Sequence, residues 1–236
     1  MKLRHAIALG IGLTTLSAAH GADAFTDALN AAYPSYRAAL FRTNSKSQTE
    51  SEQAITKTLA AWRDLSATYG SKPPAPYDRD DRFAPTLAEI QQVFDAANQE
   101  IRSGKLAEAH ETLEAARDLM AELRRRNGVI VYSDHMNAYH AEMEVVLNEG
   151  AKLLGEPQGF MLLMARVGTL DYLAERLRTE APAALAANAD FEPAVKAVED
   201  SLAGLRAAVM AQDAAQVKAA LAKVKAPYSK LFLKYG

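Results

Sequence analysis

The chain has 236 residues, with 27 Lys and Arg against 29 Asp and Glu, and no cysteine. This mild negative charge argues against a nucleic-acid partner, which needs a basic face. The lack of cysteine excludes disulfides, thiolate metal sites and covalently attached c-type haem, so any metal or haem must be held by His, Met, Asp, Glu or Tyr.

The segment 1–21 has the pattern of a secretory signal peptide. A basic start, "MKLRH", precedes the apolar run "AIALGIGLTTLSA", and Ala19 and Gly21 stand at the −3 and −1 positions of a cut before Ala22. Loss of Lys2 and Arg4 leaves 25 cations against 29 acids, a net charge of −4. The pattern predicts a periplasmic protein without stable membrane insertion, because no later run is long and apolar enough to span a bilayer.

The remaining sequence predicts an all-α fold. Alanine, leucine, glutamate and lysine dominate, and hairpin signals are nearly absent. Proline suits the first turn of a helix and glycine suits its end, and these residues divide the chain. The expected helices cover 24–43, 47–69, 84–102, 105–126, 133–153, 157–179, 191–211 and 214–234.

An internal repeat groups these helices into two units. The segment that begins "RFAPTLAEIQQVF" aligns without a gap on the segment that begins "DFEPAVKAVEDSL". The matched apolar pairs are Phe83 and Phe191, Ile90 and Val198, Phe94 and Leu202, Ile101 and Val209, and Leu113 and Leu221. We therefore expect tandem four-helix bundles, an N-terminal bundle at 22–127 and a C-terminal bundle at 128–236.

Each matched hairpin resembles the last two helices of the cytochrome b-562 family, which are soluble periplasmic four-helix bundles. "NAYH", residues 137–140, also resembles the segment that carries the haem-ligating histidine of that family. The resemblance implies a four-helix bundle and, as one alternative, a b-type haem electron carrier that uses His135 or His140 with a methionine. In the family this histidine ends the fourth helix, whereas His140 lies in the first helix of its unit, and "LMAELRRRN" and "APYSKLFLKYG" contain no histidine.

The stretch "YSDHMNAYHAEMEVVL", 132–147, is the main candidate for a ligand site. Met136, His140 and Met143 fall on one face of the expected helix, and the next helix carries Met161 and Met164 on one side. Thioethers and an imidazole in a cysteine-free protein favour copper(I). The competing interpretation is a buried helix in which methionine fills the core and the histidine is hydrogen-bonded.

The repeat offers a comparison for this candidate. In a looser alignment of the first helices, Tyr33, Arg37 and Leu40 fall where Met136, His140 and Met143 stand. The first unit would then lack the thioether and imidazole ligands expected in the second.

Other polar clusters are interpreted as solvated surface. His110 corresponds to Lys218 in the repeat and is expected to be exposed, and Glu108, Glu111 and Glu114 look like a solvated helix face. The three arginines of "LRRRN", 123–127, are expected to interact with the dipole at a helix C-terminus.

No catalytic motif is present: the sequence has no glycine-rich phosphate loop, no Gly-x-Ser-x-Gly and no His-Glu-x-x-His. We therefore expect a protein that is not an enzyme. Three functions stay open: a copper(I)-binding protein, a haem b carrier, and a cofactor-free scaffold that binds another periplasmic protein.

Overall fold

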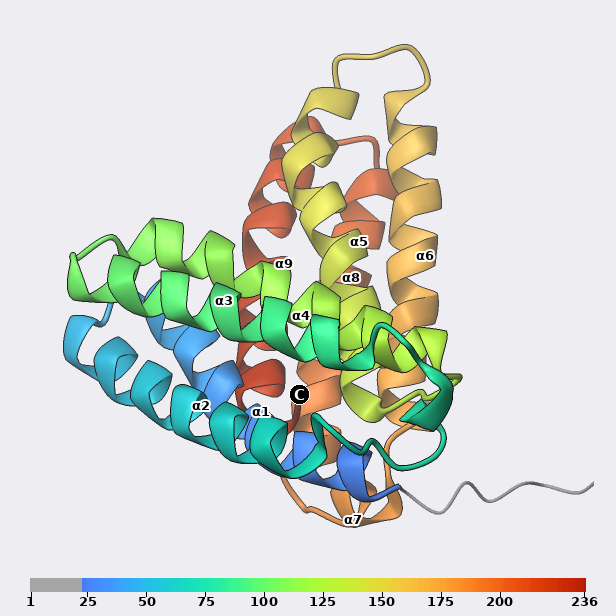
Figure 1. Ribbon diagram of the computed structural model, residues 1–236. Coiled ribbons are helices and arrows are strands. Elements are labelled where there is room, and N and C mark those ends of the chain that lie inside the picture. The colour runs from blue at the N-terminus through green and yellow to red at the C-terminus, as the bar shows by residue number, and fades with distance from the viewer. Residues whose placement is uncertain (1–22) are drawn as a thin grey trace, which may run out of the picture.

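The computed structural model describes residues 23–236, and the expected signal peptide, 1–21, lies outside the described residues. The predicted all-α fold is confirmed, because the described part of the chain contains helices and no strands (Figure 1). None of these helices combines the length and the apolar character needed to cross a bilayer.

The first bundle is formed by four antiparallel helices. They are α1 (Ala24–Asn44), α2 (Gln48–Tyr69), α3 (Phe83–Arg102) and α4 (Leu106–Arg126), with a short 3-10 helix η1 (Tyr77–Arg79) in the α2–α3 connection. Contacts between neighbours close the ring, α1 with α2, α2 with α3, α3 with α4 and α4 with α1.

The second bundle has the same construction. Its helices are α5 (Tyr132–Leu153), α6 (Gly159–Thr179), α8 (Phe191–Met210) and α9 (Ala214–Tyr235), and α7 (Ala183–Ala186) is a single turn in the α6–α8 connection. The contacts run α5 with α6, α6 with α8, α8 with α9 and α9 with α5. The turn α7 was not expected from the sequence.

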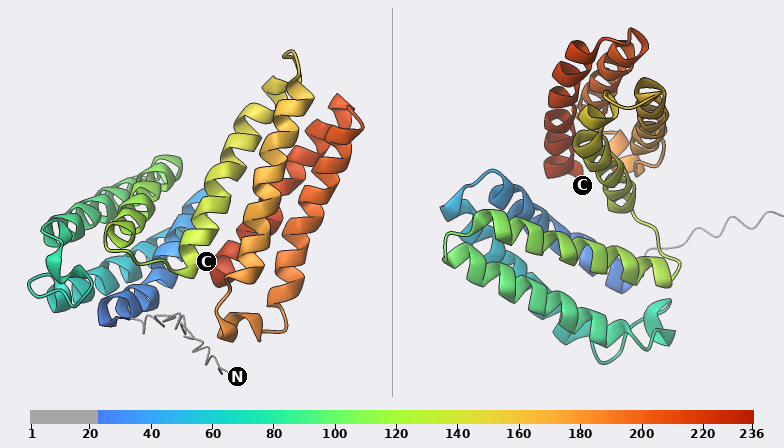
Figure 2. Two further views of the ribbon diagram at one scale, coloured as in Figure 1. Left: turned by 90° about the vertical axis from the view of Figure 1, so that its right-hand side faces the viewer. Right: turned by 90° about the horizontal axis from the view of Figure 1, so that it is seen from above.

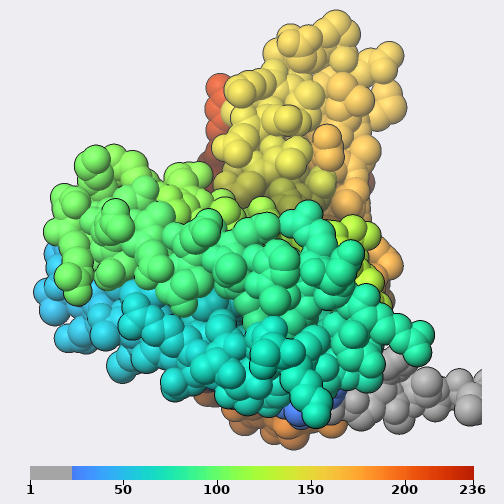
Figure 3. Space-filling model, in the orientation of Figure 1, coloured from blue at the N-terminus to red at the C-terminus, as the bar shows by residue number. Residues whose placement is uncertain are grey.

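The two bundles are steeply inclined to each other. Figure 2 shows the second bundle nearly end-on in its right-hand view, while the helices of the first bundle lie lengthwise. The space-filling view shows α5 and α6 rising behind α3 and α4 (Figure 3). Helices α1 and α9 contact each other across the junction, where the Arg37 side chain donates a hydrogen bond of 3.5 Å to the carbonyl of Lys234.

The long α2–α3 connection closes one end of the first bundle. Tyr77 of η1 is fully buried, and its ring lies 4.8 Å from that of Phe25 and 5.6 Å from that of Phe83. Its hydroxyl shares a 2.9 Å hydrogen bond with the Thr26 hydroxyl. The connection is therefore part of the core despite its irregular sequence.

The repeat seen in the sequence corresponds to equivalent helices. When Phe83 is aligned with Phe191, helices α3 and α8 begin and end at matched positions, and α4 and α9 begin at matched positions. All five apolar pairs matched in the sequence are buried in both bundles. The apolar stripe thus marks the core face of each hairpin, as helical periodicity requires.

The first helices correspond at a different register from the one expected. Buried positions of α1 and α5 coincide when Leu29 is aligned with Met136, an alignment that also pairs Tyr36 with Met143. The expected pairing of Arg37 with His140 is therefore wrong, and Tyr33 takes the position equivalent to His140. The sequence pattern alone does not fix this register, because a shift of four residues turns a helix by only about 40° and leaves a similar apolar face.

Arg124 shows that the arginines at the end of α4 are not all surface residues. Its side chain is 1% exposed and forms a two-pronged ion pair with Asp134, in which the Nε to Oδ2 distance is 3.0 Å. Asp134 also accepts a 3.0 Å hydrogen bond from the backbone N–H of Val131. The pair links the end of α4 to the start of α5. An interaction with the helix dipole alone therefore does not explain the buried position of Arg124.

Candidate functional site

The methionines of the predicted metal cluster lie in different surroundings. Met136 and Met143 are fully buried in the core of the second bundle, whereas Met161 is 64% exposed at the start of α6 and Met164 is partly buried. A thioether in the core and one in solvent do not share a single ligand shell. The structure therefore does not gather the five proposed ligands at one point.

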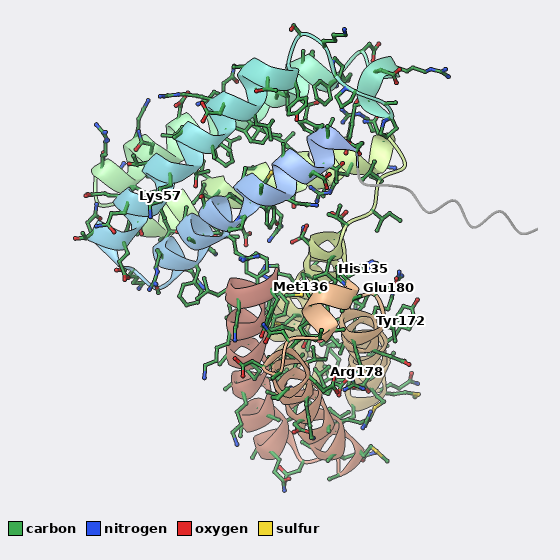
Figure 4. All side chains as sticks on the ribbon, turned by 90° about the horizontal axis from the view of Figure 1, so that it is seen from below. Lys57, His135, Met136, Tyr172, Arg178 and Glu180 are labelled. Atoms are coloured by element: carbon green, nitrogen blue, oxygen red, sulfur yellow. The ribbon has the colours of Figure 1, made fainter. Side chains whose placement is uncertain are left out.

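His135 and His140 also point in different directions, since five residues turn a helix by about 140°. His135 lies in the first turns of α5 beside Met136, at the end of the second bundle nearest the first (Figure 4). Burial lowers the pKa of His135, and the charge of Arg176 lowers it further. His140 instead faces α4 of the first bundle.

A pocket lies at the junction, where α1 and α4 of the first bundle meet α5 and α9 of the second. The space inside it has a volume of about 40 Å³, and the pocket opens to solvent. The lining side chains are Leu40, Phe41, Asn44, His110, Glu114, Arg117, Asn137, His140, Lys225, Tyr228, Ser229 and Phe232. Sites at domain interfaces that combine apolar walls with a few polar groups are typical of small-ligand binding.

Glu114 is the central polar residue of this pocket. Its Oε1 lies 3.4 Å from Nε2 of His140, 3.7 Å from Nε2 of His110 and 3.4 Å from a guanidinium nitrogen of Arg117. The His140 ring lowers the pKa of Glu114 to about 2, against the effect of burial and with further help from Arg117. The carboxylate is therefore ionised at neutral pH.

His110 is held in one orientation by the backbone of α1. Its Nδ1 lies 3.1 Å from the carbonyl oxygen of Leu40. Because a carbonyl only accepts, Nδ1 carries a proton, and Nε2 is the ring nitrogen that faces Glu114. The expectation that His110 is exposed is wrong, since its side chain is only 17% exposed.

His140 is held by the second bundle. Its ring lies 5.7 Å from the ring of Tyr228 on α9, and the Tyr228 hydroxyl donates a 2.9 Å hydrogen bond to the carbonyl of Met136. The His140 side chain is 17% exposed. Two imidazoles and a carboxylate thus meet from two bundles, with His110 and Glu114 on α4 and His140 on α5.

Two further polar groups are buried at the junction. Within residues 23–236, the amide atoms of Asn137 and the hydroxyl of Tyr33 make no hydrogen bond of ordinary geometry, although the Asn137 amide lies close enough to the Tyr33 hydroxyl to interact with it. Burial raises the pKa of Tyr33, while the charge of Arg124 and the nearby amide of Asn137 lower it. Unpaired buried polar groups are uncommon in proteins and call for an explanation.

The sequence did not reveal this cluster, although one signal was present. His110 and Glu114 are four residues apart and therefore neighbours on one helical face. Glu108 and Glu111 are exposed as expected, whereas the expectation of a solvated Glu114 is wrong, since its side chain is only 27% exposed. Within residues 23–236, no three His, Asp or Glu side chains are already arranged so that they could hold a metal ion.

Comparisons with known proteins give no family for the chain. No family model, no curated protein and no solved structure matches it. The resemblance to the cytochrome b-562 family therefore stays a prediction that depends on the matched hairpins and on "NAYH".

Proposed function

We propose that the protein is an exported binding protein for a divalent transition metal, with zinc as the first choice, and that His110, Glu114 and His140 are the ligands. The observation that carries this proposal is the position of one carboxylate oxygen between two imidazole nitrogens, at 3.4 and 3.7 Å. The site would join the two bundles, because α4 and α5 both contribute to it.

One of the two separations agrees with a tetrahedral metal site. Two atoms bound to one zinc ion at about 2.0–2.1 Å lie roughly 3.4 Å apart. His140 Nε2 and Glu114 Oε1 have this separation, and His110 Nε2 is a few tenths of an ångström too far away. A small rotation of the His110 or Glu114 side chain would complete the set.

The surrounding hydrogen bond also favours metal binding. Metal-bound histidines generally donate the proton of their other ring nitrogen to a carbonyl or carboxylate, which orients the ring. The contact between His110 Nδ1 and the Leu40 carbonyl has this arrangement. It leaves Nε2 as the nitrogen available to the metal.

The ligand types favour zinc over copper(I). Copper(I) prefers soft thioether and thiolate ligands, whereas imidazole and carboxylate suit zinc and copper(II). Met143 is fully buried and Met161 is largely exposed. The copper(I) site and the haem carrier stay as predictions without a specific observation in their favour.

Isothermal titration of the metal-free protein with zinc chloride tests the proposal. We expect one zinc ion per chain. His140→Ala and Glu114→Gln should each weaken binding by more than about tenfold, since even the loss of an outer-shell partner of a metal site costs about that much.

Two matched variants serve as controls. His135→Ala removes another histidine of α5, and Met143→Leu removes a thioether of the sequence-based cluster, so neither should change zinc affinity. Unchanged zinc binding by His140→Ala would overturn the proposal. Loss of copper(I) binding in Met143→Leu would instead favour the methionine site.

A further inference from the structure

The outward face of α6 is apolar, although the outward side of a bundle helix is ordinarily polar. Three of the five large apolar side chains that stay exposed within residues 23–236 lie on this helix, namely Met161, Leu162 and Tyr172. Met161, Ala165, Gly168 and Tyr172 are all exposed and follow at helical spacing, so they form one stripe, here called the α6 stripe. It lies on the side of the helix opposite the buried face. Exposed apolar faces of this kind mark interaction sites.

The equivalent helix of the first bundle has a polar outward face. The repeat places Trp62 of α2 on Leu170 of α6, and both residues are buried. The residues of α2 at the four positions of the α6 stripe are all exposed and mostly polar: Gln53, Lys57, Ala60 and Asp64. Figure 4 labels one residue of each set, Lys57 on α2 and Tyr172 on α6. The fold therefore does not require an apolar outward face at this place.

Gly168 supplies a second observation. Glycine in the interior of a helix weakens that helix relative to alanine. A Cβ atom added at Gly168 would meet no neighbouring atom of residues 23–236 within 4 Å, so packing inside the bundle does not explain the glycine. Together with Ala165 it leaves a place on the surface of α6 where a second helix can approach closely.

The α6 stripe carries no charge, and charged side chains beside it are held by neighbouring helices. Arg166 lies 3.3 Å from Glu142 of α5, and Asp171 lies 2.6 Å from Arg206 of α8. Helix α9, which contacts α1 of the first bundle, lies diagonally across the second bundle from α6 (Figure 1). The stripe is therefore open to solvent and does not repel a second copy of itself.

We infer that the α6 stripe pairs with the same stripe of a second copy of this chain, with the two helices antiparallel. The order of its side chains, large, small, small and large, is the same in both directions. A two-fold axis between Ala165 and Gly168 then places Ala165 of each copy against Gly168 of the other. Crossing helices are closest at these small residues and separate toward their ends. There Met161 of one copy meets Tyr172 of the other, a favourable sulfur–aromatic contact that occurs twice.

The size of the stripe sets the strength of the pairing. It extends over three turns, roughly 16 Å along the helix. This face is small beside the interfaces of about 1,200–2,000 Å² that stable complexes form. We therefore expect a dimer that dissociates in the micromolar range. The pairing does not depend on the proposed zinc site, which lies at the junction of the two bundles.

Sedimentation equilibrium in buffer with EDTA tests the pairing without any contribution from metal. The wild-type protein should change from one chain to two as its concentration rises through the micromolar range. Ala165→Lys copies Lys57 of α2 and places a long charged side chain at the closest approach, so it should weaken dimerisation by more than about tenfold. Ala60→Lys, the matched control, puts the same charge on the outward face of α2 and should dimerise like the wild type.

Gly168→Leu separates pairing from folding. Because the space around Gly168 is open, the new side chain fits the single chain, and leucine favours the helix more than glycine does. The melting temperature at low protein concentration should therefore not fall, while dimerisation should weaken by more than about tenfold. A Gly168→Leu variant that dimerises like the wild type would contradict the close approach.

Single cysteines report the orientation of the pair, because the natural chain contains none. A short bismaleimide should cross-link Met161→Cys to Tyr172→Cys when the two variants are mixed. Neither variant should cross-link alone, since equal positions at the ends of antiparallel stripes lie roughly 16 Å apart. Cross-linking within either variant alone would overturn the antiparallel arrangement.

A wild-type protein that stays monomeric at every concentration would overturn the inference. Vesicles of phosphatidylethanolamine and phosphatidylglycerol then test the other occupant of an apolar face. If the monomer sediments with these vesicles and Tyr172→Asp abolishes this binding, the α6 stripe contacts a lipid surface and the pairing is wrong.

Discussion

The hairpins α3–α4 and α8–α9 have equivalent core positions but different outward faces. Phe83 and Phe191 are both buried, as are Leu113 and Leu221. On the outward face of the same helices, His110 corresponds to Lys218 and Glu114 corresponds to Ala222. Positions that agree between the bundles form their cores, and positions that differ include the candidate site.

Equivalent positions in the other helices of the junction also carry different side chains. Tyr33 of α1 corresponds to His140 of α5, and Arg124 of α4 corresponds to Phe232 of α9. All four residues lie at or beside the contact between bundles. Equivalent helices thus meet there with unlike side chains, so the chemistry of the pocket occurs once and not twice.

The turns that precede α3 and α8 have the same hydrogen-bond pattern, although Asp80 in the first is replaced by Asn188 in the second. Asp80 accepts a 3.0 Å hydrogen bond from the N–H of Arg82, and Asn188 accepts one of the same length from the N–H of Asp190. Asp80 also accepts from Asn127, whereas Asn188 accepts from Tyr235, the residue equivalent to Asn127. The Asp80 carboxylate and the Asn188 amide therefore accept equivalent hydrogen bonds in the two turns.

Truncation of the shared core should have the largest effect. Phe83→Ala removes a ring that packs against Phe25 and Tyr77, and Phe191→Ala removes one that packs against Tyr132 and Tyr235. Each should lower the free energy of unfolding by about 3–5 kcal/mol. Urea denaturation measures both, and a cost below about 1 kcal/mol for either would contradict the equivalence of the two cores.

Replacement of the buried arginine should have the next largest effect. Arg124→Met leaves Asp134 without its partner, and since Asp134 is 21% exposed we expect a loss of about 2–3 kcal/mol, below the range for fully buried pairs. Phe232→Met at the equivalent position should cost less than about 1.5 kcal/mol. In a double-mutant cycle, Asp134→Asn should cost little once Arg124 is gone, and strict additivity would contradict the pairing.

Removal of the charge on Asp80 should have the smallest effect on the free energy of unfolding. This effect should depend on pH. Burial raises the pKa of Asp80, but hydrogen bonds from Asn127 and Arg126 outweigh burial and hold it below its ordinary value. The stabilisation is therefore present above about pH 4 and is lost as the pH falls through the lowered pKa.

Asp80→Asn, which copies the second bundle, should lower the free energy of unfolding by about 1 kcal/mol at neutral pH. The difference from wild type should shrink in acid when denaturation is followed across pH. Asn188→Ala is the control, because its cost should not change with pH. A constant difference for Asp80→Asn would contradict the assignment of a charged hydrogen bond.

Much of the fold could be predicted from the sequence because the core face of a helix repeats every three to four residues. This periodicity located the apolar positions of α3 and α8, and the proline and glycine signals placed the limits of most helices within one or two residues. It did not predict α7, a turn of alanines and one leucine with no buried residue.

The candidate site could not be predicted in the same way. Periodicity separates the core side of α4 from its outer side, but it does not say which outer residues another bundle covers. His110 and Glu114 therefore looked like solvated residues until α5 and α9 were placed against them. His140 was found as a candidate because it was placed on one helix face with Met136 and Met143, yet both methionines belong to the core.

The ion pair between Arg124 and Asp134 has a consequence for synthesis, in which the chain emerges from its N-terminus. All four helices of the first bundle are complete at Arg126, but the partner of the buried arginine arrives only with residue 134. Until then a guanidinium at the end of α4 lacks the carboxylate that compensates its burial. The first bundle should therefore reach its final packing only after the first turn of α5 has emerged. Completion of its folding then depends on the first residues of the second bundle.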